Sequence, residues 1–186
     1  MTDLVELRPG LLRWTAPHPE WEPDAEPESP ADWPQDVGCV LCRTPGATVL
    51  IDPLVPDDLW AALDEQVRGP VHVLTTIRWH GRSRDDVVAR YDGTEDVPDG
   101  VEAIPVLDET MYWLPEHAAL VPGDRLIGDS PLRMCPQSWF ARSGKTLDDL
   151  RAALRPVLER PVELVLVSHG EPVLEGGRDA LERALA

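Results

Sequence analysis

The stretch VLTTIRWHGRS, residues 73–83, reads as the end of an apolar strand, a short polar loop and the start of a helix. Ser83, with Asp86 three residues later, resembles a helix capping box in which Asp replaces Glu. The loop itself carries His80 with Arg78 close by. Loops at strand ends commonly hold functional groups because the rigid strand aims their side chains. The stretch therefore predicts a loop built to carry a site.

Three other stretches share this arrangement, in which an apolar strand stops abruptly in a polar or glycine-containing loop. They are LIDPLVP (50–56), YWLPEHAALVPGD (112–124) and LVLVSHGEPV (164–173). Around them, apolar periodicity predicts strands, a helix, a strand, a helix, several strands, a helix, a strand and a final helix. This mixed order is typical of α/β proteins in which helices flank sheets.

Taken in order, the four stretches resemble the metallo-β-lactamase superfamily, over about residues 38–174. The resemblance implies an α/β fold, the αββα sandwich, with a metal site at one edge that usually holds zinc or iron and is usually hydrolytic. It also implies roles for three residues. Asp52 matches an Asp that supports the site, Asp124 matches the hairpin Asp that bridges two metals, and His169 matches the last His ligand.

The sequence departs from the family at its main motif, Leu-Thr-His-x-His-x-Asp-His. Thr76 stands at the first His, Arg78 at the second, His80 at the Asp and Gly81 at the last His. Arginine is always charged and has only donors, so it cannot ligate a cation. The family's further His before the hairpin has no counterpart in PVLDET (105–110). We therefore expect the first of the two metal positions to be lost.

The second metal position keeps a sensible donor set in His80, Asp124 and His169, which are our candidate catalytic and metal-ligating residues. Two imidazoles and a carboxylate leave one coordination position open for water, whose pKa a bound metal would lower. We expect at most one zinc or iron ion there. Because the charge of Arg78 lies two residues from His80, the sequence favours a polar pocket without metal. Asp129 belongs to a second Gly-Asp pair and competes with Asp124, which the hairpin match favours.

Four residues are candidates for substrate binding: Thr76, Arg78, His18 and Asp52. Arg78 is expected to hold an anionic group of the substrate in place of a second metal. Asp52 either orients the neighbouring loops or supports a site His from behind. His18 lies between prolines and could reach over the site, although an exposed loop position is the stronger expectation.

Two segments outside the motifs bear on function. We expect one metallo-β-lactamase-like domain over residues 1–186, with a loop rich in Pro, Trp and acids at 15–36 that acts as a flap or mobile arm. The stretch 131–146 carries aromatic and arginine side chains and could wall a pocket for an anion, together with Arg82 and Arg84. Ordinary surface ion pairing is the competing explanation for these arginines.

Three functional hypotheses follow. The first is a hydrolase with a degenerate site, in which one metal activates water on an unknown, possibly anionic small molecule. The alternative is a catalytically inactive member that binds a small anion or a protein partner without metal. The third is a structural role in an assembly, mediated by the Trp-rich loop at 15–36.

Composition narrows the location and the partners. The chain has 34 Asp and Glu against 17 Lys and Arg, a net charge of −17, which argues against nucleic acids and anionic membranes. Its three cysteines are too few and too widely spaced for a disulfide framework, and the acidic N-terminus does not resemble a secretory signal. We therefore expect a cytoplasmic protein, and the sequence leaves its oligomeric state open.

Overall fold

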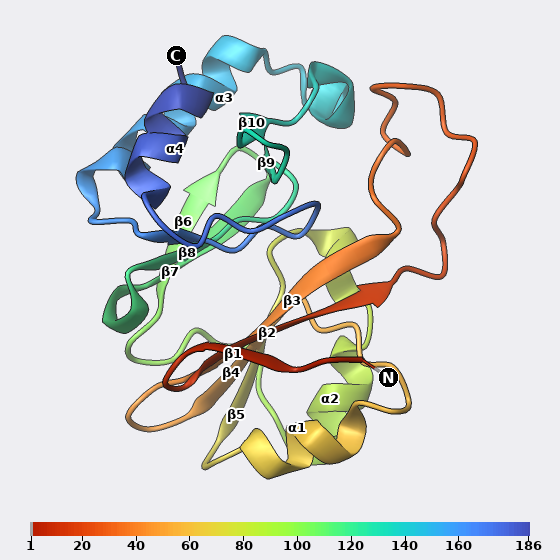
Figure 1. Cartoon of the computed structure of the whole chain (residues 1–186), viewed down its shortest axis with the longest axis vertical. Helices are drawn as coiled ribbons and strands as arrows, with labels where there is room; N and C mark the ends of the chain where they lie inside the picture. Colours follow the sequence, from red (N-terminus) through yellow and green to blue (C-terminus); the bar gives the residue numbers. More distant parts are fainter. Residues whose placement is uncertain (1) are drawn as a thin grey trace.

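The computed structural model describes residues 2–186 and has four layers, with two β-sheets packed face to face between two pairs of helices (Figure 1). The first sheet has the order β1-β2-β3-β4-β5. Its strands are β1 (Val5–Arg8), β2 (Leu11–Pro17), β3 (Asp36–Arg43), β4 (Thr48–Ile51) and β5 (Val71–Leu74). The second sheet has the order β11-β8-β7-β6. Its strands are β6 (Glu102–Val106), β7 (Glu109–Leu114), β8 (Ala119–Val121) and β11 (Leu164–Val165).

Helices cover the outer face of each sheet. The helices α1 (Trp60–Gln66) and α2 (Arg84–Tyr91) cover the first sheet, and α3 (Leu147–Leu154) and α4 (Gly177–Ala184) cover the second. Short 3-10 helices occur at η1 (Arg78–Gly81), η2 (Pro115–His117), η3 (Gln137–Ser143) and η4 (Arg155–Glu159), and β9 (Leu126–Ile127) pairs with β10 (Arg133–Met134). The predicted αββα sandwich is confirmed.

The alternation of side chains along β3 explains why both of its faces are apolar. Val40 and Cys42 pack between the sheets, whereas Cys39 and Leu41 pack beneath α1 and α2. Successive residues of a strand point to opposite faces, so a strand in an inner layer must be apolar throughout. All three cysteines are buried and free.

Two parallel strand pairs bring the motif loops to one edge of the sandwich. Strand β4 is parallel to β5, so the loop at Asp52 and the loop at Thr76 leave the first sheet side by side. Strand β8 is parallel to β11, which brings the loops that carry Asp124 and His169 together in the same way. A bridge between Val37 and His169 then joins the last loop to the first sheet.

The capping box predicted at Ser83 is not formed. Ser83 is the N-cap residue of α2, but its side chain makes no capping bond. Its hydroxyl instead accepts a hydrogen bond of 2.9 Å from the backbone N–H of Val55. A contact with a distant loop has therefore replaced the local bond, and it holds the β4–α1 connection against the start of α2.

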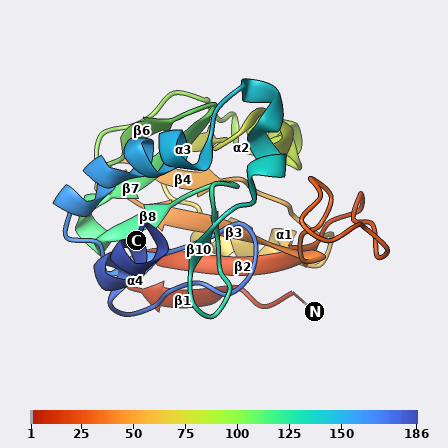
Figure 2. The same cartoon turned by 90° about the horizontal axis from the view of Figure 1, so that it is seen from above.

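The segment between β2 and β3, residues 18–35, contains no helix or strand and extends beside the site edge (Figure 2). The indole of Trp21 donates to the carbonyl of Trp33 within the loop. Trp139 of η3 donates to the carbonyl of Ser29, at 2.8 Å. These bonds hold the loop to itself and to η3. Among residues 2–186, no helix has the length and apolarity that spanning a bilayer requires.

Candidate functional site

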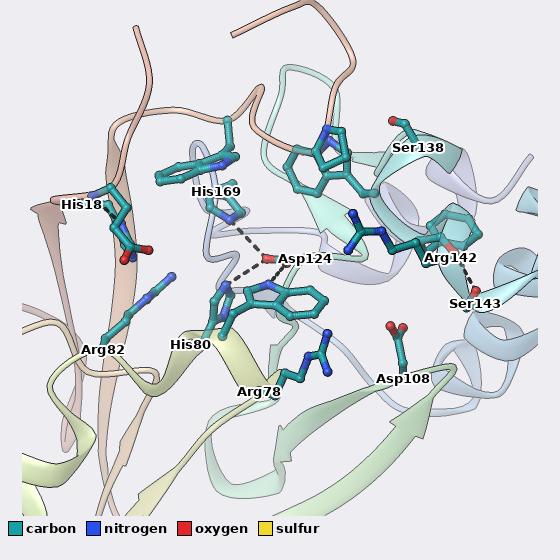
Figure 3. A pocket seen from close by; sticks show the side chains of 16 residues that line it. His18, Arg78, His80, Arg82, Asp108, Asp124, Ser138, Arg142, Ser143 and His169 are labelled. Atoms are coloured by element: carbon teal, nitrogen blue, oxygen red, sulfur yellow. Dashed lines mark hydrogen bonds and ion pairs between the residues drawn. The ribbon is translucent and has the colours of Figure 1, made fainter.

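A pocket of about 430 Å³ opens at the edge where the motif loops meet (Figure 3). Its walls come from the loop at 18–35, from η1, from η3 and from the loops that carry Asp124 and His169. Segments far apart in the sequence therefore build it, and its volume is in the range of small-molecule sites.

His80, Asp124 and His169 lie together at the bottom of this pocket. The Oδ1 atom of Asp124 is 3.0 Å from Nε2 of His80 and 3.1 Å from Nε2 of His169. All three side chains are buried, and their candidate ligand atoms lie within 4.8 Å of one another. The geometry thus joins the three residues named from the sequence. Asp129, the competing Asp, is exposed and pairs with Arg133.

Asp52 and Thr76 lie behind His80, on the side away from the pocket. Oδ2 of Asp52 is 2.9 Å from Nδ1 of His80, and Oδ1 accepts a bond of 2.8 Å from the backbone N–H of Thr76. The hydroxyl of Thr76 donates to the same Oδ2, at 2.5 Å. Both residues are buried and neither lines the pocket, so here they orient His80 rather than face a substrate.

The carboxylates on both sides of His80 control its charge. Burial alone would lower the pKa of His80, but Asp52 and Asp124 outweigh burial and raise this pKa to about 9. In return, His80 holds the pKa of Asp124 well below its usual range, against the opposing effect of burial. Burial lowers the pKa of His169. Without a metal, His80 is therefore the protonated imidazole of the pair and His169 the neutral one.

This charge pattern predicts a pH dependence for protein kept free of metal. The folded-state pKa of His80 is raised from 6.5 to about 9, so its stabilising effect is full below about pH 6.5 and is lost as the pH rises through about 9. The expected loss in the free energy of unfolding is roughly 3 kcal/mol. Urea unfolding in chelator at both ends of this range measures it. A His80→Gln variant should lack this loss, and an equally large loss in the variant would assign it to other groups.

Trp79 separates the charge of Arg78 from the three-residue cluster. The indole Nε1 of Trp79 donates to Oδ2 of Asp124, at 2.7 Å. The guanidinium carbon of Arg78 lies 5.4 Å from the centre of the Trp79 ring. Figure 3 shows the Arg78 side chain directed away from His80. Arg78 is close to His80 in the sequence, and this closeness argued against a metal. In the structure, the charge of Arg78 is directed away from the three-residue cluster.

His18 stands at the rim of the pocket and is half-buried. Its Nδ1 accepts a bond of 3.2 Å from the backbone N–H of Glu20, and its ring lies edge-on to Trp33 with 5.1 Å between centres. Burial and then Arg82 lower the pKa of His18. Within residues 2–186, the cluster of potential metal ligands contains only the three residues at the bottom, so His18 does not rebuild the first metal position.

Glu109, which the sequence motifs did not single out, holds the loop that carries Asp124. Its carboxylate accepts backbone N–H groups of Gly123 at 2.9 Å, Asp124 at 2.7 Å and Arg125 at 3.1 Å. Burial and the charge of Asp124 raise the pKa of Glu109 to about 7. The sequence did contain a signal for this role. Glu109 lies on the same strand face as the core residue Met111, and an acid buried on that face needs hydrogen-bond partners.

Arg82 ties two loops and strand β3 together at the side of the site. Its guanidinium donates to the carbonyl of Asp52 at 2.9 Å, to the carbonyl of Gly38 at 3.2 Å and to the hydroxyl of Ser168 at 2.7 Å. The sequence suggested that Arg82 helps to bind an anion. In the structure, its guanidinium is largely engaged by these contacts within the protein. Arg84 pairs with acids on α2 and beyond and does not line the pocket.

No protein-family model matches the chain, and no curated protein matches it. Solved structures do match it. A crystal structure of the DIM-1 metallo-β-lactamase exposed to ceftazidime aligns with 99% of this chain and 96% of its own, at 10% identity and a TM-score of 0.61. A metallo-β-lactamase from Erythrobacter litoralis aligns over 99% and 90%, at 15% identity and a TM-score of 0.55. A metallo-β-lactamase family protein from Thermus thermophilus aligns over 96% and 78%, at 14% identity and a TM-score of 0.55.

These matches extend over nearly the whole chain, so the protein has the metallo-β-lactamase fold. A buried His-Asp-His group lies at the site edge of this fold and could hold a metal. At three positions where the motif Leu-Thr-His-x-His-x-Asp-His has histidine, this chain has Thr76, Arg78 and Gly81.

Proposed function

We propose that this protein is a divergent metallo-β-lactamase-fold hydrolase that uses one zinc or iron ion held by His80, Asp124 and His169. The observation that carries the proposal is the position of the Asp124 carboxylate, whose Oδ1 lies within 3.1 Å of both imidazole Nε2 atoms in a buried pocket. Ligands of one tetrahedral zinc ion with bonds of about 2.0–2.1 Å lie roughly 3.3 Å apart. Both Asp124–imidazole distances are close to this spacing, and all three ligand atoms lie within 4.8 Å of one another, which supports one shared ion.

The surrounding hydrogen bonds also suit a metal site. The bond between Asp52 and Nδ1 of His80 fixes this imidazole so that Nε2 faces Asp124. Carboxylate–histidine pairs of this kind orient metal ligands in many metalloproteins. Trp79 occupies Oδ2 of Asp124, which leaves Oδ1 directed at both imidazoles. His169 is held by ring contacts with Trp33 and Trp139, at 5.3 and 5.6 Å between centres.

Within residues 2–186, the three replaced motif positions provide no ligands for a second ion. Thr76 is bonded to Asp52 behind His80, Arg78 is a cation, and Gly81 has no side chain. In the part of the chain that the structure describes, no other group of three His, Cys, Asp or Glu residues lies at ligand distance. The proposed site is therefore mononuclear.

A bound metal would make hydroxide available near neutral pH and polarise the bond to be broken. The chain's own residues would do the rest. Asp52 and Thr76 fix His80, Glu109 fixes the backbone at Asp124, and the indoles of Trp33 and Trp139 exclude water from His169. This arrangement supports the proposed hydrolysis of a small molecule in the pocket.

Metal analysis of protein purified without chelators tests the proposal. We expect about one equivalent of zinc or iron after supplementation of the medium. Hydrolysis of a panel of esters, thioesters, lactams and phosphodiesters is then measured with and without chelator. Less than about a tenth of an equivalent after both zinc and iron supplementation would reject the metal mechanism.

Replacing Asp52 with Asn should weaken metal binding without touching a ligand. The variant loses the charge that fixes the protonation of Nδ1 of His80, and such partners contribute about 10- to 100-fold to metal affinity. Titration of zinc against a competing chelator measures the change. Asp57→Asn, an exposed Asp on the neighbouring loop, is the matched control and should bind zinc like the wild type. Equal affinities of the two variants would contradict the role of Asp52.

A metal-free anion-binding protein is the second candidate function. The series Asp52, His80, Asp124 and His169 is linked by hydrogen bonds, so the bottom of the pocket is stable without an ion. The same metal analysis separates the two candidates, because this protein would contain no metal and its ligand binding would survive chelator treatment.

A further inference from the structure

We propose that Arg78 and Arg142 form an arginine pair that binds the phosphate or carboxylate group of a substrate whose flat apolar part packs against Trp79, Trp139 and Phe140. The proposal rests on the proposed function only for the reaction, in which the bound anion would orient the scissile bond toward the metal ligands. Binding of the anion itself needs no metal, so the two proposals can fail separately.

The two arginines belong to different arms of the same pocket. Arg78 comes from η1, at the position where the family motif has a metal ligand, and Arg142 comes from η3. Both are exposed and both line the pocket. Figure 3 shows Arg142 above and Arg78 below the same space, with Asp108 at the level of Arg78.

Neither member of the arginine pair forms an ion pair with any residue in 2–186. Other arginines of this region are already engaged with the protein. Arg82 binds backbone carbonyls, Arg133 binds Asp129 and Arg125 binds Asp108. Two arginines that line one pocket without a carboxylate partner are free to bind the anionic group of a ligand.

The acids of the pocket do not neutralise the arginine pair. Asp124 is engaged by two imidazoles and the Trp79 indole. Asp108 is bound to the buried Arg125, at 2.8 Å. Glu20 belongs to the other side of the pocket, where its backbone N–H contacts His18. The positive charge of Arg78 and Arg142 therefore faces the pocket.

Aromatic side chains beside the arginine pair define the rest of the ligand. The Trp79 side chain is 46% exposed although it stands at a pocket wall, which is unusual for a large apolar group. Trp139 and Phe140 come from η3, next to Arg142. A pocket with an apolar wall and two guanidinium groups fits an aromatic or similarly flat molecule with one oxyanion. Two positive charges favour a phosphate dianion over a carboxylate.

The probes are phenyl phosphate, benzoate and the neutral compound phenol, titrated by tryptophan fluorescence and calorimetry. Each titration is made with chelator-treated and with zinc-loaded protein. We expect phenyl phosphate to bind more tightly than benzoate, benzoate more tightly than phenol, and phenyl phosphate to bind in both preparations. Arg78→Ala and Arg142→Ala should each weaken phenyl phosphate about 10- to 100-fold.

Arg183→Ala is the matched control, because this exposed arginine on α4 lies outside the pocket and its removal changes the net charge equally. It should bind phenyl phosphate like the wild type. Equal binding of phenyl phosphate and phenol, or wild-type affinity in both pocket variants, would overturn the arginine pair. Phenyl phosphate binding that depends on Arg78 in protein unable to bind zinc would overturn the metal proposal and keep the arginine pair.

Discussion

Replacing Asp124 with Asn is expected to remove the proposed metal and with it the proposed hydrolytic activity. The carboxylate is the only anionic group among the three candidate ligands and lies against both imidazoles. Asn keeps the shape but loses the charge that attracts a cation. Bound zinc should fall from about one equivalent to less than about a tenth, and turnover by about 1,000-fold or more. Elemental analysis and single-substrate kinetics measure both quantities.

Asp129→Asn is the control for this experiment. Asp129 is the Asp of the second Gly-Asp pair of the same region, but it is exposed and pairs with Arg133 outside the pocket. This variant should keep the zinc and the activity of the wild type. A full equivalent of zinc in Asp124→Asn, or loss of zinc in Asp129→Asn alone, would show that the wrong Asp has been assigned to the site.

Replacing Glu109 with Ala should destabilise the protein by about 3–5 kcal/mol, because it leaves three buried backbone N–H groups without their acceptor. Urea unfolding measures the free energy. Glu109→Gln keeps one acceptor and should cost less. Glu102→Ala is the control, since Glu102 is exposed and pairs only at the surface with Arg160. A Glu109→Ala variant within about 0.5 kcal/mol of the wild type would contradict this role.

The fold could be predicted from the sequence because its signals are local. Apolar stretches that end abruptly at Asp52, at Thr76 and before His169 mark the strands and their direction. Parallel pairing of β4 with β5 and of β8 with β11 then forces these ends to one edge. The motif order, through its resemblance to the metallo-β-lactamase superfamily, was therefore enough to predict that His80, Asp124 and His169 lie together.

The parts of the site that escaped prediction depend on contacts between distant segments. Nothing near Ser83 indicates that its hydroxyl accepts a bond from Val55 instead of capping its own helix. The bond from Trp79 to Asp124 joins residues 45 positions apart, and it directs the neighbouring Arg78 away from the cluster. Sequence proximity suggested the opposite. The role of Glu109 could have been predicted, but only by combining the register of its strand with the fact that the same strand face packs in the core.

The central claim is that one metal ion binds between His80, Asp124 and His169. Anomalous diffraction at the zinc edge, from crystals grown with zinc, tests it most directly. The account predicts one strong peak at about 2.0–2.2 Å from Nε2 of His80, a carboxylate oxygen of Asp124 and Nε2 of His169. No peak at this position, or a pair of peaks about 3.5–4 Å apart as in a dinuclear centre, would contradict it.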